Sequence, residues 1–361
     1  MCRSADNSVR RASPRSGGRL LCCTLAALVL IDLTVRAHSD ALARYDPHDR
    51  AGKLRSYVRG PEGRVVCMGS SRAAYALVPG ELERVLERSA FNLALSATKP
   101  PEWETICRDV LSRRPPSLVI LGVNAGELNA KYVPTEGASA YFGFRDVVRH
   151  ARWVGFNRDL LQTYALATLG RGWALYGRRY EVRTWIDEQL GRVSSHYGAT
   201  ARRIAARREG RFGPDGYDHP WLAGHSLRTL TERLADHQGV HAAEIPVFEP
   251  LAPSMRCLHG VLDWFADRDI PLAVVYVPNS PRAQERWRAV EPLVQAVIAA
   301  MCRQRGVPFI RPDVPMSDDE FVDETHMGLD LAYRFSAALA QELAGRTGLR
   351  LPSSRVACVA P

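Results

Sequence analysis

Short apolar runs alternate with amphipathic helical patterns over two parts of the chain. The apolar runs lie at residues 65–68, 89–93, 117–123, 271–277 and 307–310. The helical patterns lie at residues 79–88, 102–113, 255–267, 285–305 and 329–343. Such alternation is typical of parallel strands joined by helices. We therefore predict an α/β fold, a flavodoxin-like three-layer α/β/α sandwich with a parallel five-stranded sheet, in which active sites lie at the carboxyl ends of the strands.

The middle of the chain, residues 129–253, shows helical periodicity and no convincing strand. Helices are expected at residues 158–169, 181–190, 200–209 and 227–237. We interpret the stretch as a large helical insertion between two parts of the α/β domain, residues 62–128 and 254–346, with residues 347–361 as a C-terminal tail. Its arginine-rich run, residues 202–211, could bind an acidic glycan, but such runs are more often solvated helix faces.

The N-terminal pattern predicts a membrane segment. Residues 1–19 carry five arginines and one aspartate, and residues 20–35 are apolar with three polar exceptions. A basic flank before an apolar run predicts an anchor whose N-terminus lies in the cytoplasm. Residues 1–36 would then form the cytoplasmic tail and anchor, residues 37–61 a linker, and the rest of the chain would lie outside the cytoplasmic membrane.

A cleaved signal peptide is the main alternative to the anchor. Its small-residue cleavage candidate, residues 41–43, lies several polar residues beyond the apolar run. A lipoprotein attachment site is not expected, because Cys22 and Cys23 open the apolar run instead of closing it. Asp32 lies near the far end of the run, where a carboxylate can reach the membrane interface.

The net charge of +9 does not by itself indicate a nucleic-acid partner. Of the 48 basic residues, 45 are arginine, and the chain is also rich in alanine, glycine and proline. That imbalance reflects the codon usage of a GC-rich genome better than a phosphate-binding surface. We therefore expect no nucleic-acid binding.

Four cysteines lie outside the anchor and off the predicted strands, at Cys107, Cys257, Cys302 and Cys358. In an exported domain they could form disulfides, in any of three connectivities. The alternative is that they are reduced and buried as small apolar residues. No Cys-x-x-Cys pair is present in the sequence, so a structural zinc site has no support.

Candidate chemistry gathers where the predicted strands end. The first strand ends in Gly69-Ser70-Ser71, and a serine at a tight strand-to-helix turn is held exposed, as nucleophilic catalysis requires. The third strand ends at Asn124, whose amide could supply one arm of an oxyanion hole. Each signal alone is weak, since both residue types are also common in turns and helix caps.

A carboxylate and a histidine follow near the C-terminus. Asp323 precedes His326 by three residues, just before the last predicted helix. At that spacing Asp323 can accept from the Nδ1–H group and leave Nε2 free to act as a base for a serine. The other histidines, including His219 and His225, are expected to be surface or loop residues.

Together these segments resemble the four motif blocks of the SGNH or GDSL hydrolase superfamily, which occur in this order at successive strand ends. The resemblance covers residues 65–124 and 272–343. It implies that Ser71 is the nucleophile, in a Gly-Ser-Ser block where Gly-Asp-Ser is usual, and that the final block supplies Asp323 and His326.

The resemblance also implies an oxyanion hole. Its donors would be the backbone N–H groups of Ser71 and Ala97 and the side chain of Asn124. Two residues depart from the family pattern: Ser70 replaces an aspartate, and Ala97 replaces a glycine. The second change leaves an N–H donor unharmed only if residue 97 has a negative φ.

The Gly-Ser-Ser block, the anchor and the insertion resemble the branch that includes the D-alanyl-lipoteichoic acid transfer protein and the alginate O-acetylation proteins. Members of that branch act outside the cytoplasmic membrane beside a membrane-bound O-acyltransferase. The resemblance implies a membrane-anchored serine acyltransferase or esterase that needs no metal or organic cofactor. Its acceptor would be a glycan hydroxyl of a cell-envelope or exported polysaccharide, or another hydroxyl.

Two alternatives stay open. One is a catalytically inactive subunit with the same fold that binds a glycan or assembles a polysaccharide-modifying complex, which the departures at Ser70 and Ala97 would fit. The other is an unrelated α/β domain in which all four blocks are ordinary turns and caps. Reaction of Ser71 with a serine-directed phosphonate would separate an enzyme from an inactive subunit.

Overall fold

The computed structural model describes residues 14–43, 50–129, 144–156, 158–193, 215–217 and 246–346. Its centre is a sheet of five parallel strands in the order β2-β1-β3-β4-β5. The strands are β1 (Val65–Met68), β2 (Ala90–Asn92), β3 (Leu118–Val123), β4 (Leu272–Tyr276) and β5 (Phe309–Ile310). The predicted α/β class and five-stranded parallel sheet are therefore confirmed.

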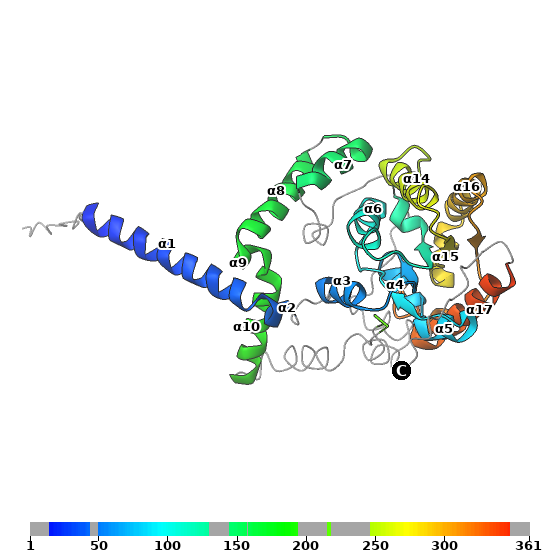
Figure 1. The fold of residues 1–361 in the computed structure, drawn as a ribbon, viewed down its shortest axis with the longest axis horizontal. Helices are drawn as coiled ribbons and strands as arrows, with labels where there is room; N and C mark the ends of the chain where they lie inside the picture. The colour runs from blue at the N-terminus through cyan, green and yellow to red at the C-terminus, as the bar shows by residue number, and fades with distance from the viewer. Residues whose placement is uncertain are drawn as a thin grey trace, which may run out of the picture.

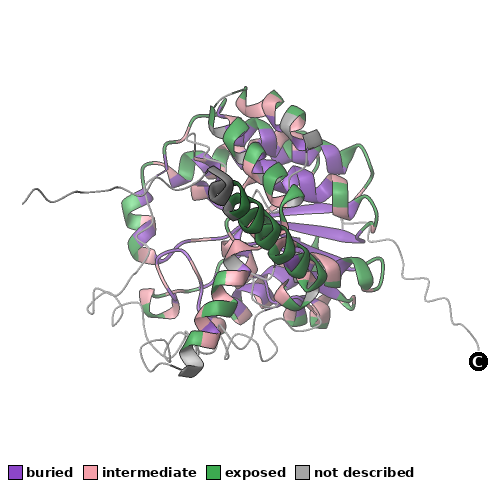
Figure 2. Ribbon diagram, turned by 90° about the vertical axis from the view of Figure 1, so that its left-hand side faces the viewer, coloured by how far each residue is buried: buried purple, intermediate pink, exposed green. Residues whose placement is uncertain are grey.

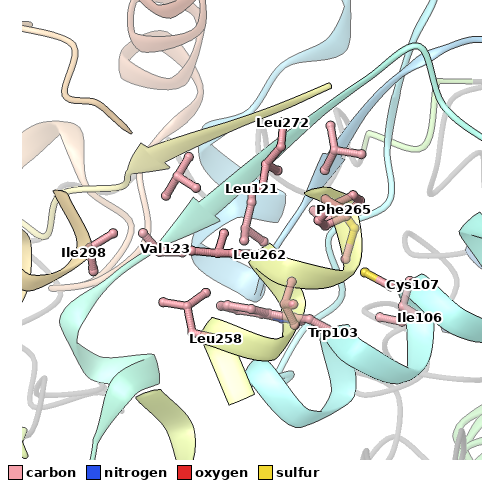
Figure 3. Packing of buried hydrophobic residues seen from close by; sticks show 14 of the residues in the cluster. Trp103, Ile106, Cys107, Leu121, Val123, Leu258, Leu262, Phe265, Leu272 and Ile298 are labelled. Atoms are coloured by element: carbon pink, nitrogen blue, oxygen red, sulfur yellow. The ribbon is translucent and has the colours of Figure 1, made fainter. Parts of the chain in front are cut away.

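Successive side chains of each strand point to opposite faces of the sheet, and both faces are covered by helices. On one face, Val66 and Met68 pack in a core under α6 (Pro100–Ile106), α14 (Pro253–Ala266) and α16 (Glu291–Gln304). Figure 3 shows part of this core, where Trp103 lies among residues of α14 and β3.

On the other face, Val65 and Cys67 pack under α4 (Ser71–Ala76), α5 (Pro79–Leu86) and α17 (Leu329–Gly345). All four β1 residues are buried. Continuous apolar runs, without polar alternation, are what a strand covered on both faces needs. This is why the apolar runs in the sequence predict the short strands.

Two predicted helices differ from those observed. The pattern at residues 102–113 is a helix, α6, that continues as a π-helix, η1 (Cys107–Leu111). The single helix predicted at residues 285–305 is wrong, because the chain forms α15 (Pro281–Trp287) and then α16. Pro292, in the first turn of α16, has no backbone N–H and cannot continue a preceding helix.

The N-terminal part forms α1 (Pro14–Ala37), α2 (Ser39–Ala43) and α3 (Arg50–Arg59). None of the helices in the described part of the chain is both long enough and apolar enough to cross a membrane. Although α3 falls in the predicted linker, it packs on the domain. Its Lys53 and Tyr57 are buried, and Tyr57 donates to the Arg114 carbonyl oxygen over 2.7 Å.

A short 3-10 helix, η2 (Ala125–Leu128), precedes the insertion, whose described part forms α7 (Phe144–Val154), α8 (Arg158–Gly172), α9 (Ala174–Gly177) and α10 (Arg179–Val193). These helices stand between α1 and the sheet domain (Figure 1). The helices predicted at residues 200–209 and 227–237, the arginine-rich run, His219 and His225 lie outside the described residues.

A short piece of the insertion, Asp215 to Tyr217, reaches into the edge of the sheet. The Asp215 carbonyl oxygen accepts from Asn92 N of β2 over 2.8 Å, and the Tyr217 ring is fully buried in the core under α4. Gly216 between them has φ +76, and a Cβ there would lie 2.6 Å from the Asn92 carbonyl oxygen. The insertion therefore supplies part of the core.

The described cysteines are all free. Cys107, Cys257 and Cys302 are fully buried, as is Cys67 on β1. Burial raises the pKa of the Cys302 thiol to about 12 and raises the pKa of Cys107 and Cys257 well above the usual value. Of the two alternatives left open by the sequence, reduced and buried thiols therefore hold for these three cysteines. Cys358 lies outside the described residues.

His150 is an exception among the histidines expected at the surface. It is a buried residue of α7, where Nε2 is 3.0 Å from the Pro101 carbonyl oxygen of α6 and Nδ1 contacts the Tyr164 hydroxyl of α8. Burial lowers the pKa of His150 to about 4, against opposing effects of Glu104 and the Pro101 carbonyl. The folded protein therefore holds a neutral imidazole at this junction.

His150 should make the free energy of unfolding depend on pH. Between about pH 6.5 and the folded pKa, the unfolded chain binds a proton that the folded chain does not. The stabilisation is therefore complete above about pH 6.5 and decreases towards pH 4, by up to about 3 kcal/mol. Urea unfolding of wild type and His150→Gln at two pH values in this window tests it. The variant should lose less stability on acidification, and equal losses would contradict the prediction.

Candidate active site

Ser71 is positioned by a tight turn between β1 and α4. It is the first residue of α4, and the Ser70 hydroxyl caps the helix by accepting from Arg72 N over 3.2 Å. Gly69 has φ +141, and a Cβ there would lie 2.6 Å from both the Gly122 carbonyl oxygen and the Ala73 Cβ. Only glycine fits this approach, so α4 begins directly at the carboxyl end of β1.

The structure brings Ser71, His326 and Asp323 together. Ser71 Oγ lies 2.8 Å from His326 Nε2, and His326 Nδ1 lies 2.8 and 2.9 Å from the two carboxylate oxygens of Asp323. With Nδ1–H donating to Asp323, Nε2 accepts from the Ser71 hydroxyl. All three residues are partly buried, so the hydroxyl stays within reach of a substrate. This chain of hydrogen bonds is the arrangement in which histidine deprotonates serine.

Asp323 is held as an ionised acceptor. Its Oδ1 accepts from Thr325 N over 2.8 Å, from Thr325 Oγ1 over 2.9 Å and from His326 N over 3.0 Å. Burial alone would raise the pKa of Asp323. His326 and the hydrogen bonds from Thr325 have the larger combined effect and bring the pKa well below the usual range. Asp323 therefore fixes the orientation of the imidazole and stabilises its protonated form.

The loop that carries Asp323 and His326 is closed at its base and tied to α15. An antiparallel bridge joins Phe321 to Met327, and the buried Glu324 forms ion pairs with Arg286 and, at 3.8 Å, with Arg282. Sequence reasoning missed these arginines, since nothing in the local pattern links residues so far apart.

Tyr75 packs against the histidine. It lies one turn after Ser71 on α4, and its ring centroid is 4.6 Å from that of His326, with the planes tilted by 38°. The Tyr75 carbonyl oxygen accepts from the hydroxyl of Tyr217, the buried residue of the insertion, over 2.7 Å. The helix that carries Ser71 is therefore contacted by the insertion.

Asn124 lies at the end of β3 and is completely buried. Its Nδ2 donates to the Val277 carbonyl oxygen over 2.7 Å, and its Oδ1 accepts from Gly126 N over 2.9 Å. The predicted oxyanion donor is thus at the expected strand end, with one amide hydrogen directed at the backbone after β4. An oxyanion role would fall to the second hydrogen of that amide.

Ala97 does not have the negative φ that would make its replacement of a glycine harmless. Ala97 has φ +60, a left-handed conformation in which a Cβ is strained by about 1–2 kcal/mol. Its loop is fastened to the first motif, because the Gly69 carbonyl oxygen accepts from Leu95 N over 3.0 Å and from Thr98 Oγ1 over 3.1 Å. Ala97 therefore adopts a backbone conformation that favours glycine, and this raises the energy of the folded state. Strained residues of this kind often occur at functional sites.

Glu127 was missed and lies behind the nucleophile. Its carboxylate is 3% exposed and accepts from the Ser70 hydroxyl and, over 2.9 Å, from Asn124 N, while Arg72 Nη1 lies 3.7 Å away. Burial raises the pKa of Glu127, and Arg72 and Ser70 oppose the shift. The sequence signal was the Asn-x-x-Glu spacing of a capping box from Asn124. Ser70 therefore contacts a carboxylate although the usual aspartate is absent.

In the described ranges, no group of three or more His, Cys, Asp or Glu side chains could hold a metal ion. The site that the structure presents is built from a serine hydroxyl, an imidazole and a carboxylate. Such a site can transfer an acyl group through a covalent intermediate.

Replacing Ala97 with glycine should stabilise the protein. Glycine relieves the left-handed strain, and we expect the free energy of unfolding to rise by up to about 1 kcal/mol. Ala296→Gly, at an exposed position in the interior of α16, is the matched control and should be destabilising by about 1 kcal/mol. Chemical denaturation of both variants tests the prediction, and destabilisation of both would contradict it.

Comparison with known proteins does not identify a family for this chain. No protein-family model matches the chain, and no curated protein is significantly similar to it.

Proposed function

We propose that this chain is a serine acyltransferase or esterase of the SGNH type, with Ser71 as nucleophile, His326 as base and Asp323 as the residue that orients His326. The observation that carries the proposal is the unbroken hydrogen-bond chain from Ser71 Oγ through His326 to Asp323. Ser71 lies 255 residues before His326 in the sequence, so local turn or capping preferences do not explain the contact between the serine and the Asp323–His326 loop.

The reaction would proceed in two half-reactions. Ser71 Oγ attacks the carbonyl carbon of an acyl donor while His326 Nε2 takes the hydroxyl proton. The tetrahedral intermediate collapses, His326 gives that proton to the leaving group, and an ester on Ser71 remains. A sugar hydroxyl or water then loses its proton to Nε2 and attacks the ester carbonyl, and the proton returns to Ser71 Oγ.

The oxyanion donors would be the N–H groups of Ser71 and Ala97 and the side chain of Asn124. Each such donor contributes on the order of 3–4 kcal/mol to the lowering of the barrier. Supporting this assignment, the loop of Ala97 is hydrogen-bonded to Gly69, next to the nucleophile, and Asn124 shares the Glu127 carboxylate with Ser70.

The strand order supports an SGNH-like fold. The order 2-1-3-4-5 is that of flavodoxin-like sheets, in which ligands bind beyond the carboxyl ends of the strands. Ser71 follows β1, Asn124 follows β3, and the Asp323–His326 loop is hydrogen-bonded to Ser280, beyond β4.

The proposed setting is the outer side of the cytoplasmic membrane, where the acceptor would be a hydroxyl of a cell-envelope or exported polysaccharide. A membrane-bound O-acyltransferase is the proposed partner. Both proposals rest on the basic N-terminal flank and on the resemblance to acyl-transferring proteins. The proposed reaction uses no metal or organic cofactor.

A catalytically inactive glycan-binding or assembly subunit is the second candidate. It is favoured by the strained Ala97 and by the amide hydrogen that Asn124 directs at Val277. The assembled Ser71, His326 and Asp323 weigh against it, because a binding role needs no hydrogen-bond chain ending at a serine hydroxyl within reach of a substrate.

Intact-mass analysis of the full chain in detergent, after incubation with p-nitrophenyl acetate, tests the proposal. Wild type should gain an acetyl adduct or release nitrophenol, and Ser71→Ala should do neither, with turnover lower by about 10⁴-fold or more. Ser112→Ala, an exposed serine after η1, is the control and should behave as wild type. Full reactivity of a folded Ser71→Ala variant would overturn the mechanism.

A further inference from the structure

An apolar pocket lies in the insertion, far from Ser71 along the chain. It has a volume of about 330 Å³ and is formed by α9, the residues flanking it and α10. Its lining residues are Trp173, Leu175, Tyr176, Arg179, Val182, Arg183 and Ile186. The pocket is lined almost entirely by apolar atoms and opens broadly to the surface.

The α10 side of the pocket is a helical stripe that continues beyond it. Arg179, Val182, Arg183 and Ile186 are spaced at i, i+3, i+4 and i+7, which places them on one face of α10, and Leu190 follows on the same face. Ile186 is 43% exposed and Leu190 is 39% exposed. We call this stripe, together with Trp173, Leu175 and Tyr176, the α9–α10 surface.

The α9–α10 surface is attached to the end of α1. Asp32 Oδ1 accepts from Leu175 N over 2.8 Å, Asp32 Oδ2 accepts from Arg36 Nε over 2.8 Å, and Arg36 also donates to the Gly172 carbonyl oxygen. These bonds fix the two residues that flank Trp173 and Ala174. Asp32 and Arg36, at the end of α1, therefore hold the pocket against α1.

Helix α1 itself carries exposed apolar side chains, at Leu21, Leu25, Leu28, Val29, Leu30, Ile31 and Leu33. In Figure 1 α1 projects away from the rest of the protein at the level of α9 and α10. Figure 2 looks at that side of the molecule and shows α1 pointing towards the viewer and exposed along its length. The exposed apolar residues of α1 and the α9–α10 surface thus adjoin at the base of α1.

Two arginines line the pocket together with its aromatic and apolar side chains. The Arg179 guanidinium lies 4.5 Å from the centre of the Tyr176 ring, and Trp173 stacks on Tyr176 with centroids 6.2 Å apart. The Arg183 side chain is 80% exposed and lies 3.9 Å from Asp187. Long cationic side chains and Trp or Tyr rings around an apolar patch are typical of surfaces at a lipid headgroup layer.

We propose that the α9–α10 surface binds the headgroup layer of an anionic lipid bilayer, with a lipid acyl chain in the pocket and Arg179 and Arg183 next to its charged headgroup. A lipid fits better than a second protein because the apolar residues of α1 adjoin this surface and need the same kind of environment. The proposal does not depend on the function of Ser71, so acyl-transfer assays and lipid binding can fail separately.

Trp173 is the reporter, since it lines the pocket and is 37% exposed. The full chain is reconstituted into phosphatidylcholine vesicles with and without an equal share of phosphatidylglycerol, each carrying brominated acyl chains. The Trp173 signal is the difference between wild-type and Trp173→Phe emission. We expect this signal to be quenched by brominated lipid and protected from iodide, more strongly when phosphatidylglycerol is present.

Two variants and a control locate the contact. Ile186→Glu puts a charge in the pocket and should lower the quenching of Trp173 by about fivefold or more, because a carboxylate enters an apolar layer unfavourably. Arg183→Gln should reduce the extra quenching caused by phosphatidylglycerol, because Arg179 alone would then face the anionic headgroup. Leu293→Glu, at a 59% exposed position of α16, should leave quenching unchanged.

Three results would overturn the proposal. Absence of bromolipid quenching of Trp173 would show that no lipid reaches the pocket. Protection from iodide without bromolipid quenching would show that a protein, either a partner or a second copy, covers the surface instead. Equal quenching with and without phosphatidylglycerol would exclude the anionic headgroup.

Discussion

The site depends on how closely α4 approaches the sheet. A Cβ on Gly69 or on Gly122 would lie 2.6 Å from the Ala73 Cβ, so two glycines and one alanine set the distance between α4 and the ends of β1 and β3. A larger side chain at any of the three would lift α4 from the sheet. Ser71 would then lose its place opposite His326, which is held by an independent loop.

Buried polar contacts then connect the strand ends to one another. Glu127 joins the turn after β1 to the turn after β3, through Ser70 and Asn124. Asn124 in turn contacts the backbone after β4, where Ser280 N donates to the Glu324 carbonyl oxygen of the histidine loop over 3.0 Å. Because each group is buried and partnered, a shift of one segment would leave donors or acceptors of the others unsatisfied. The geometry of the hydroxyl and the imidazole is therefore maintained by the network behind them.

Local pattern was sufficient for the strands and for the residues beside them, but not for contacts between distant segments. Continuous apolar runs identified all five strands, and Ser71 and His326 were identified by their positions near strand ends or before a helix. The φ of Ala97 depends on a loop that is hydrogen-bonded to the turn after β1, and Tyr217 enters the core from a stretch between two predicted helices. Such features follow from tertiary contacts. Removing the insertion would also remove Tyr217 from the core, so its sequence limits do not mark a separable module.

The buried thiols have a consequence for how the chain can mature. Only the thiolate exchanges with disulfides, and at Cys107, Cys257 and Cys302 burial both hinders access and raises the pKa. Once folded, these three cysteines resist oxidation even in an oxidising compartment. Mispairing among them is thus a hazard only while the chain is unfolded, and rapid folding would protect them without a disulfide isomerase.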